Sequence, residues 1–310
     1  MRIISFKKTL PLSFSCGTGL CLGHFDGVHV GHKALFEELK RRNAARAQKL
    51  PLGVLCFTTP PTATLNKQPT PQLTTLEEKL ALIAAAGLDF AVLYDFPSIK
   101  DMPPEQFVSE ILVGECNAKM LVCGFNYSFG AHGAGTPTDL ERLFCTQDDR
   151  ALSVMPPVTD GPLTVSSSLV RALLLGGHPD DAARLMARPY TLTGTVTDGR
   201  RLGRTMGLPT ANLTFPDGAL VPLHGVYAVT VKIGTRTYQG ISNVGTRPTV
   251  NHGRDVNCET FIFDFKGELY GREIKICFLH FLREEQKFEG LDELEAQIRC
   301  DIERAKQYLS

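Results

Sequence analysis

Short apolar runs alternate with amphipathic helical patterns up to about residue 185, and this alternation restricts the fold more than any other feature of the sequence. The apolar runs lie at 19–22, 52–57, 90–96 and 118–125. Helical patterns follow the first three of them, over 33–48, over 75–87 and from Pro103-Pro104 onward. Such an alternation predicts an α/β domain with a parallel sheet covered on both faces. We expect its ligand site at the carboxyl ends of the strands.

From about residue 187 the rhythm changes to short β-rich runs separated by turn residues. These runs lie at 190–199, 225–245, 258–265 and 273–282. Residues 232–239 have the pattern of a β-hairpin, and residues 291–309 have that of one long helix. We therefore predict an antiparallel β-barrel domain with a C-terminal helix. The predicted domains are 1–186 and 187–310, and a chain of 310 residues is long enough for both.

Composition and charge argue against several classes of function. The formal net charge is +0 at pH 7, so no bulk basic field attracts nucleic acid or a membrane surface. No stretch approaches the roughly 18 apolar residues of a membrane span, and Pro11, Gly17 and Gly19 interrupt the N-terminal apolar stretch. Nine scattered cysteines without a Cys-x-x-Cys pair indicate reduced thiols. We expect a cytoplasmic protein without membrane or nucleic-acid partners; an oligomer remains possible.

The sequence GHFDGVHVGH, residues 23–32, follows the first apolar run and places His29 and His32 at the expected start of a helix. Residues three apart share one helix face, so both imidazoles can point at one ligand. Three interpretations compete: zinc ligation, structural capping of the helix, and a pair that holds phosphate. The third fits best, because a helix N-terminus offers free N–H groups to an anion and Gly31 allows a ligand close approach.

The ten-residue sequence resembles the G-x-FDG-x-H-x-GH form of the HxGH nucleotidyltransferase signature, as found in bifunctional riboflavin kinase/FMN adenylyltransferases, the prokaryotic FAD synthetases. Two further segments resemble that family: VSSSLVR at 165–171 and GFNYSFG at 124–130. The resemblance implies a Rossmann-like nucleotidyltransferase domain in which ATP and FMN meet and His29 and His32 act in catalysis. It also implies a set of nucleotide-binding residues, namely Gly23, Phe25, Gly31, Asn126, Ser166, Ser167, Ser168 and Arg171. Phe129 is expected to be a packing residue.

One segment departs from the family pattern. The family commonly carries F-[DE]-PHP at the end of the second strand, whereas this chain reads Phe57-Thr58-Thr59-Pro60-Pro61. Both the acid and the histidine are absent. If those groups help to position phosphates or magnesium, their absence would make adenylylation slow or abolish it. We still expect the adenylyltransferase to be active.

In the second half, GRTMGLPTAN at 203–212 resembles the riboflavin kinase signature G-x-x-x-G-x-PTAN, with Leu208 in place of its phenylalanine. The resemblance implies that Gly203 and Gly207 fold a loop around phosphates. Thr210 and Asn212 would then hold Mg²⁺ with ATP, because hydroxyl and amide oxygens are ligands that magnesium accepts. By the same resemblance Glu259, in CETFIFDF, is the catalytic base. We also expect Glu259, Phe261 and Phe263 to share one strand face, opposite Thr260, Ile262 and Asp264. A role for Arg247 beside the flavin or in a turn is left open.

These observations give a leading hypothesis and two alternatives. The first is FAD biosynthesis: riboflavin is phosphorylated with ATP to FMN, which is then adenylylated to FAD. Its substrates are riboflavin, FMN and ATP, with Mg²⁺ as cofactor. The first alternative is a protein that retains the kinase activity but has an impaired adenylyltransferase. The second alternative is a flavin-binding regulatory protein in which both sites are inactive. The intact Glu259 and PTAN segment argue against this last interpretation.

Overall fold

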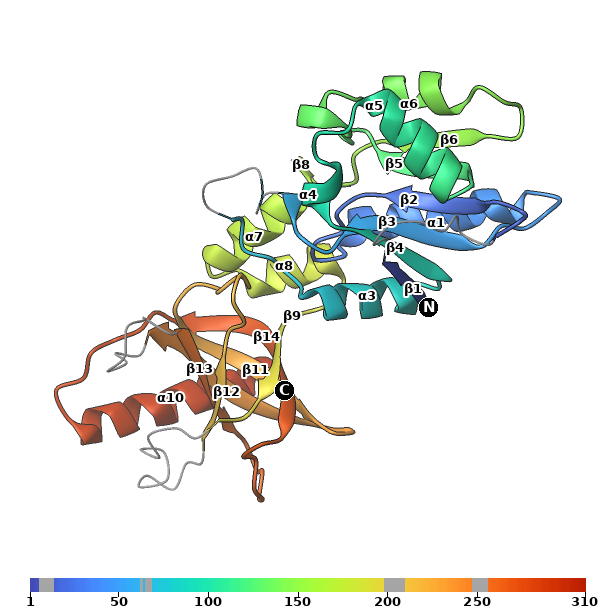
Figure 1. The fold of residues 1–310 in the computed structure, drawn as a ribbon. Helices are drawn as coiled ribbons and strands as arrows, with labels where there is room; N and C mark the ends of the chain where they lie inside the picture. Colours follow the sequence, from blue (N-terminus) through green and yellow to red (C-terminus); the bar gives the residue numbers. More distant parts are fainter. Residues whose placement is uncertain (6–13, 62–63, 65–68, 198–209, 247–255) are drawn as a thin grey trace. The chain divides into compact units, whose positions relative to one another are not determined.

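The computed structural model describes residues 1–5, 14–61, 64, 69–197, 210–246 and 256–310. Contacts divide the chain into two compact units, Met1–Ser167 and Ser168–Ser310, which are described one at a time (Figure 1). Gly203, Gly207, Leu208 and Arg247 lie outside the described residues. No helix in the described part of the chain is long and apolar enough to cross a membrane.

The first unit contains a six-stranded sheet in which all strands are parallel and the order is β1-β4-β3-β2-β5-β6. Its strands are β1 (Arg2–Ser5), β2 (Thr18–Leu22), β3 (Leu52–Phe57), β4 (Phe90–Tyr94), β5 (Ala118–Gly124) and β6 (Ala151–Met155). From β2 the chain proceeds outward to β3 and β4 on one side, and later to β5 and β6 on the other. The order therefore reverses between β2 and β5, where ligands of open α/β sheets bind.

Helices cover both faces of this sheet. They are α1 (Val30–Ala44), α3 (Leu76–Ala85), α4 (Phe96–Ile99), α5 (Pro104–Gln106), the π-helix η1 (Phe107–Glu115), the short 3-10 helix η2 (Ala131–Gly133) and α6 (Pro137–Phe144). On one face of the sheet, Leu39 of α1 and Ile83 of α3 lie in one core cluster with Cys21 and Val122 of the strands. The other face, with Leu20 and its neighbours, carries η1 and α6. A small antiparallel pair, β7 (Thr159–Asp160) and β8 (Leu163–Thr164), follows β6.

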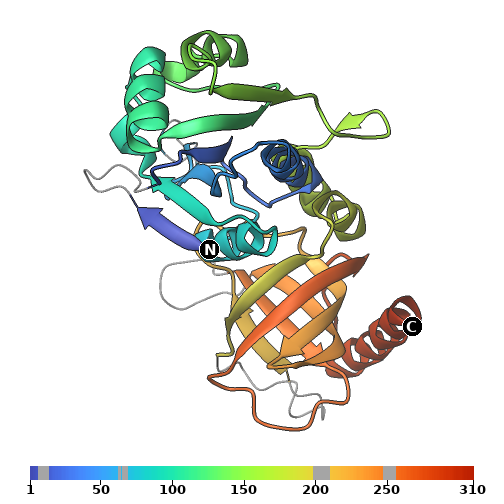
Figure 2. The same cartoon turned by 90° about the vertical axis from the view of Figure 1, so that its right-hand side faces the viewer.

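The second unit contains a curled antiparallel sheet of order β10-β13-β12-β11-β14-β9 (Figure 2). Its strands are β9 (Tyr190–Thr195), β10 (Thr210–Thr214), β11 (Gly225–Ile233), β12 (Arg236–Thr246), β13 (Val256–Ile262) and β14 (Glu273–Arg283). An antiparallel bridge between Thr197 and Asn212 joins the two edges. Leu213, Tyr227 and Val244 fill the interior of the curl and are fully buried. This confirms the barrel-like sheet.

Three helices accompany the curled sheet. Helix α7 (Ser167–Leu175) begins at the last residue of the first unit, and α8 (Pro179–Met186) follows it. Helix α10 (Leu291–Leu309) lies on the outside of the curl, where Ile298 and Ile302 pack against buried apolar residues of the sheet. Contacts thus group most of α7 and all of α8 with the curled sheet, whereas the predicted domain boundary at residue 187 is placed after them.

Candidate functional site

A tightly folded loop follows β2 at the point where the strand order reverses. Phe25, Gly27 and Val28 have positive φ values of 56°, 77° and 40°. For Phe25 and Val28 this conformation carries strain, which persists only where surrounding contacts hold it. At Gly27, a Cβ atom would lie 2.7 Å from the Leu73 side chain. Gly27 is therefore favoured for two reasons: its positive φ and the lack of space for a Cβ atom beside Leu73.

Asp26 supplies many of the contacts that hold this loop. Its side chain is 2% exposed and accepts hydrogen bonds from the backbone N–H groups of Leu73 and Thr74 and from the Thr74 hydroxyl, at 3.0 to 3.3 Å. The Thr74 hydroxyl also accepts from the Gly27 N–H at 3.2 Å. On the other side, the Ser167 hydroxyl donates to the Asp26 carbonyl at 2.9 Å. The loop is thereby tied to the start of α3 and to the first residue of α7.

His29 is the N-cap of α1. Its Nδ1 accepts a hydrogen bond from the His32 N–H at 3.3 Å, and its side chain is 5% exposed. The two imidazole rings stack with centroids 3.6 Å apart. These contacts confirm that the pair begins a helix and shares one face, and they show that the capping interpretation is correct for His29. Because an accepting Nδ1 is unprotonated, neutral His29 carries its proton on Nε2.

His32 is held in its neutral form. Burial lowers the pKa of its imidazole well below 6.5, and the neighbouring charges of His29, His24 and Lys79 lower it further. Its Nδ1 is buried and has no hydrogen-bond partner among the residues that the structure describes. The His pair therefore offers neutral N–H donors at a helix N-terminus, where the helix dipole favours an anion.

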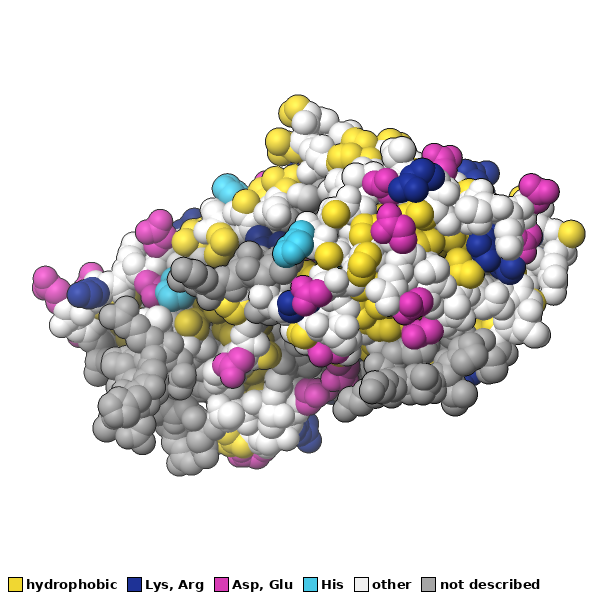
Figure 3. Space-filling view, turned by 45° about the horizontal axis from the view of Figure 1, so that its top comes forward, with side chains coloured by type: hydrophobic (Ala, Val, Ile, Leu, Met, Phe, Trp, Pro, Cys, Tyr) yellow, Lys and Arg dark blue, Asp and Glu magenta, His cyan; other side chains and the backbone are white. Residues whose placement is uncertain are grey.

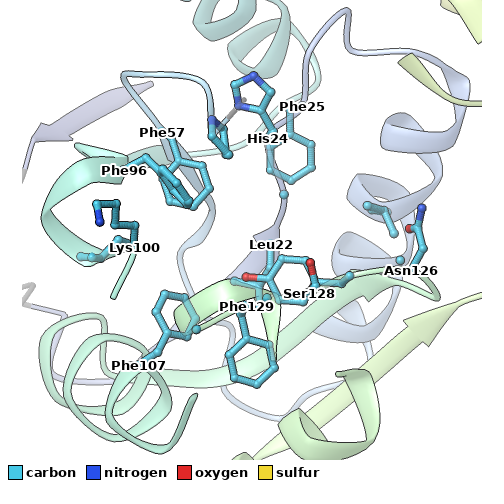
Figure 4. Close-up of a pocket in the computed structure, with 18 of the residues that line it drawn as sticks. Leu22, His24, Phe25, Phe57, Phe96, Lys100, Phe107, Asn126, Ser128 and Phe129 are labelled. Atoms are coloured by element: carbon cyan, nitrogen blue, oxygen red, sulfur yellow. The ribbon is translucent and has the colours of Figure 1, made fainter. Parts of the chain in front are cut away.

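A cavity of about 350 Å³ opens beside this loop, at the carboxyl ends of β2, β3, β4 and β5. Figure 4 shows Phe57 and Phe96 together on one side of it and Phe107 and Phe129 along another. His24, Phe25 and His32 line it near the loop, and Asn126 and Ser128 come from the segment after β5. The lining is thus mainly apolar with a few polar groups, among them Lys100 beside Phe96, and such a lining suits a flat ring that carries a charged tail.

The sequence-predicted residues of this half have distinct positions. Gly23, Phe25, His32 and Asn126 line the cavity. A Cβ atom on Gly31 would lie 3.1 Å from the His29 ring, so this glycine makes room for the stacked pair. Phe129 is 5% exposed and packs in the core, which confirms its expected role.

The serine segment opens α7, as expected of a serine-rich helix start. Ser166 precedes the helix, Ser167 is its first residue and is bonded to the loop, and Ser168 is exposed. Arg171 is half-buried on the same helix. Ser167 thus supports the loop through its hydroxyl, a role that the sequence did not indicate.

The second candidate site lies on the outer face of β10 and β13. Asn212 stands directly opposite Glu259 in the antiparallel register, and the Thr210 hydroxyl donates to Glu259 Oε1 at 2.8 Å. Asn212 is 2% exposed, and its Oδ1 accepts from the Asn257 amide at 3.0 Å. The structure thus brings all three predicted residues of this site together. Glu259 and Phe261 share a face as predicted, but β13 ends at Ile262, so Phe263 and Asp264 lie beyond the strand.

A cavity of about 310 Å³ adjoins this face, between the curled sheet and the region around α10. Thr210, Glu259 and Phe261 line it from the sheet. Arg283 and Asp301 also line it, and three hydrogen bonds of 2.8 to 3.1 Å join them, with Asp301 only 1% exposed. This ion pair fixes α10 to β14, so the wall of the cavity is held by a buried electrostatic contact.

The donors at this second site fit a hard divalent cation. Thr210 offers a hydroxyl and Asn212 an amide oxygen, on the same face of two paired strands as the Glu259 carboxylate. Oxygen ligands of this kind suit magnesium, which keeps several of its waters. Among the described residues, no group of three or more His, Cys, Asp or Glu side chains is placed to hold a metal.

Charged side chains do not gather by sign on the face of the molecule drawn in Figure 3, where acidic and basic groups are interspersed among apolar ones. This agrees with a net charge of +0. Anionic ligands therefore depend on local groups such as the N–H donors of α1.

Comparisons with known proteins match both halves of the chain. A family model described as FAD synthetase matches residues 13–169, and one described as riboflavin kinase matches residues 186–309. A protein of Bacillus subtilis, named bifunctional riboflavin kinase/FMN adenylyltransferase, is 34% identical over 94% of this chain and 92% of its own length. A protein of the same name from Escherichia coli K12 is 34% identical over 99% and 98%.

Among solved structures, one from Streptococcus pneumoniae has a TM-score of 0.88 and 30% identity, with 99% of each chain covered. It is named a macrolide-efflux protein, an activity different from that named for the two sequence relatives. The likeness shows that the fold described above is shared along the whole chain.

Proposed function

The chain belongs to the family of bifunctional riboflavin kinase/FMN adenylyltransferases, and from that premise we propose which of its residues carry each reaction. It is an ATP-dependent enzyme of FAD biosynthesis that phosphorylates riboflavin to FMN and adenylylates FMN to FAD. We assign adenylylation to residues 1–186 and phosphorylation to residues 187–310. The matches of the two family models to 13–169 and 186–309 support this division.

In the kinase reaction, Glu259 is the base that accepts the proton of the riboflavin 5′-hydroxyl as the γ-phosphoryl group is transferred. The half-buried carboxylate lies beside the Thr210 hydroxyl, and the cavity of about 310 Å³ next to it has the size class of small-molecule sites. Phe261 and Phe288 offer it apolar contacts for a flavin ring. Thr210 and Asn212 would hold Mg²⁺, which when bound neutralises charge on the ATP phosphates.

In the adenylylation, the FMN phosphate attacks the α-phosphorus of ATP and pyrophosphate leaves. This reaction needs no enzyme nucleophile, because the attacking phosphate is already ionised; the protein aligns the reactants and stabilises the charge that develops. His29 and His32 donate hydrogen bonds to the phosphates at the N-terminus of α1, and the phenylalanines of the cavity of about 350 Å³ contact a flat ring. Asn126 lines the same cavity, and we assign it a hydrogen bond to base or ribose.

One observation carries this proposal: the rings of His29 and His32 stack, and His29 caps α1 at the point where the strand order reverses. The test is to incubate the purified protein with riboflavin, ATP and Mg²⁺ and to separate the flavins by chromatography. FMN followed by FAD is the expected result. Absence of both products overturns the proposal, and replacement of Mg²⁺ by a chelator tests the metal.

FMN supplied directly with ATP tests the first unit alone. In this structure Thr58 and Thr59, which replace part of the family segment, bond to the end of β4: the Thr58 N–H donates to the Tyr94 carbonyl at 2.9 Å and the Thr59 hydroxyl to Asp95 Oδ1 at 3.0 Å. They shape the loop beside the cavity without supplying an acid or imidazole. FMN converted to FAD supports adenylylation despite this change.

We place both reactions in the cytoplasm, since both consume ATP and the structure has all nine cysteines as thiols.

A further inference from the structure

A buried lysine lies beneath the histidine loop. Lys79, on α3, is 4% exposed, and its Nζ donates a hydrogen bond to the carbonyl of His24 at 3.2 Å. Burying an ammonium group is costly, and an apolar side chain of similar length would fill the same space without that cost. The charge at this position therefore calls for an explanation other than the stability of the fold.

The surroundings of Lys79 show what its charge faces. Burial lowers the pKa of the Lys79 ammonium, and the neighbouring Cys56 on β3 and the Asp26 carboxylate of the loop offset this only in part. In the described part of the chain, Lys79 is not among the residues that line the cavity of the first unit. It reaches the loop from the α3 face of the sheet and acts on backbone, so it does not touch the reactants.

Resting on the proposed adenylylation, we propose that Lys79 is a positioning residue for that reaction: its ammonium fixes the His24 carbonyl from behind, and with it the strained loop that carries His29 and His32. Asp26 anchors the same loop through its side chain, and Ser167 through the Asp26 carbonyl. Lys79 adds a further anchor, at the backbone carbonyl of His24, whose ring is also bonded to Gln72 at 2.9 Å. A loop with positive φ at Phe25 and Val28 relaxes when such an anchor is lost.

The same charge also acts on the histidine pair. Three groups near His32 disfavour its protonation: His29 of the helix cap, His24 of the loop and Lys79 from α3. Of these three groups, Lys79 is the one whose charge can be removed without replacing a histidine. Removal of its charge therefore raises the pKa of His32, so that the imidazole becomes protonated at a higher pH.

The test uses Lys79→Met, which keeps the length and removes the charge, and Lys79→Arg, which keeps a cationic donor. Lys40→Met is the matched control: Lys40 is a half-buried lysine on α1 that donates to the Ala86 carbonyl at 3.0 Å, at the far end of the same helix α3. For each variant, kcat and KM for FMN adenylylation are measured from pH 5.5 to 8.5. Riboflavin phosphorylation in the same preparation reports whether the protein is intact.

Lys79→Met is expected to lower kcat for FAD formation about tenfold to a hundredfold, the scale of a small misplacement of catalytic groups, with KM changed less than threefold. The acid limb of its pH profile is expected to move to higher pH. Lys79→Arg is expected to restore most of kcat, and Lys40→Met to match the wild type in both reactions.

Wild-type kcat and an unchanged pH profile in Lys79→Met overturn the inference, as does an equal loss of activity in Lys40→Met. If the first unit of Lys79→Met does not fold, its thermal transition is absent. In that case Lys79→Arg is the variant that tests the positioning role. A folded Lys79→Arg enzyme without FAD synthesis then refutes the positioning role. Failure of the proposed function is a separate outcome, because in that case the wild type itself forms no FAD from FMN.

Discussion

Substitution of His29 separates helix capping from catalysis, because one imidazole ring serves both. Nδ1 accepts from the His32 N–H at 3.3 Å, which leaves Nε2 as the ring nitrogen that can donate to a phosphate. His29→Ala removes both nitrogens. His29→Asn keeps an acceptor oxygen close to the position of Nδ1, since asparagine is a preferred N-cap residue, and removes only the Nε2 donor.

The two effects differ in size and in the measurement that reports them. Loss of an N-cap costs about 1 kcal/mol, which corresponds to about 2–4 °C in Tm for a domain of this size class. Loss of one donor to a developing negative charge costs about 10²–10³ in kcat. His29→Ala is therefore expected to be less stable and slow. His29→Asn is expected to be nearly as stable as the wild type and equally slow.

The assay supplies FMN, ATP and Mg²⁺ and follows FAD by chromatography, with thermal unfolding measured on the same samples. Riboflavin phosphorylation is the internal control and is expected to be unchanged in both variants, because its proposed residues lie in the other unit. The reasoning is refuted if His29→Asn forms FAD at the wild-type rate while His29→Ala does not. That result would make His29 a structural cap and nothing more.

Three further predictions concern the rest of the molecule. Glu259→Gln is expected to reduce riboflavin phosphorylation by about 10²–10⁴-fold, the usual contribution of a general base, and to leave FMN adenylylation intact; a kinase assay at saturating ATP measures it. Asp301→Ala leaves the Arg283 guanidinium buried without its partner, so the second unit is expected to lose about 3–5 kcal/mol, measured by denaturant unfolding, and to bind riboflavin more weakly. Burial lowers the pKa of His32 below that of the unfolded chain, so the unfolded state binds the proton first. The stability contributed by this group is therefore complete above about pH 6.5 and declines as the pH falls below that value. Thermal unfolding at pH 5.5 and 7.5, with His32→Gln as the variant that lacks the effect, checks this sign.

Long periodic segments were predictable from the sequence. The run at 52–57 is β3 and the helix at 291–309 is α10, with bounds as expected, and the hairpin at 232–239 joins β11 and β12. The hydrophobic period of 291–309 extends over 19 residues, 52–57 is an apolar run, and Gly234 marks the turn of the hairpin. The edge strands β1 and β6 were missed, because each is short and carries exposed side chains such as Ile3 and Val154, which weaken the pattern.

Site residues that belong to a short sequence motif could be predicted. A residue whose hydrogen-bond partner is remote in the sequence could not. His29, Glu259 and Thr210 stood in motifs. Lys79 lies in a helix whose acidic and basic residues look solvent-exposed, and its acceptor is 55 residues away. The one available signal was that Lys79 falls on the apolar face of α3, beside the buried Leu80 and Ile83. A cation at a position expected to be buried warrants a search for the group that it contacts.

The geometry divides the ten-residue histidine sequence into residues that shape the loop and residues that face the ligand. Asp26 and Gly27 are buried and bonded to the start of α3, and Gly31 makes room for a ring, so they shape the loop. His32 lines the cavity, and His29 stacks on it while capping α1. Loop-shaping positions tolerate little change, because their hydrogen bonds are buried and an unmade one costs about 1–3 kcal/mol. We therefore expect residues outside the cavity lining to determine where His32 lies in it. A search for activity differences among chains of this kind should therefore include the start of α3 as well as the histidines.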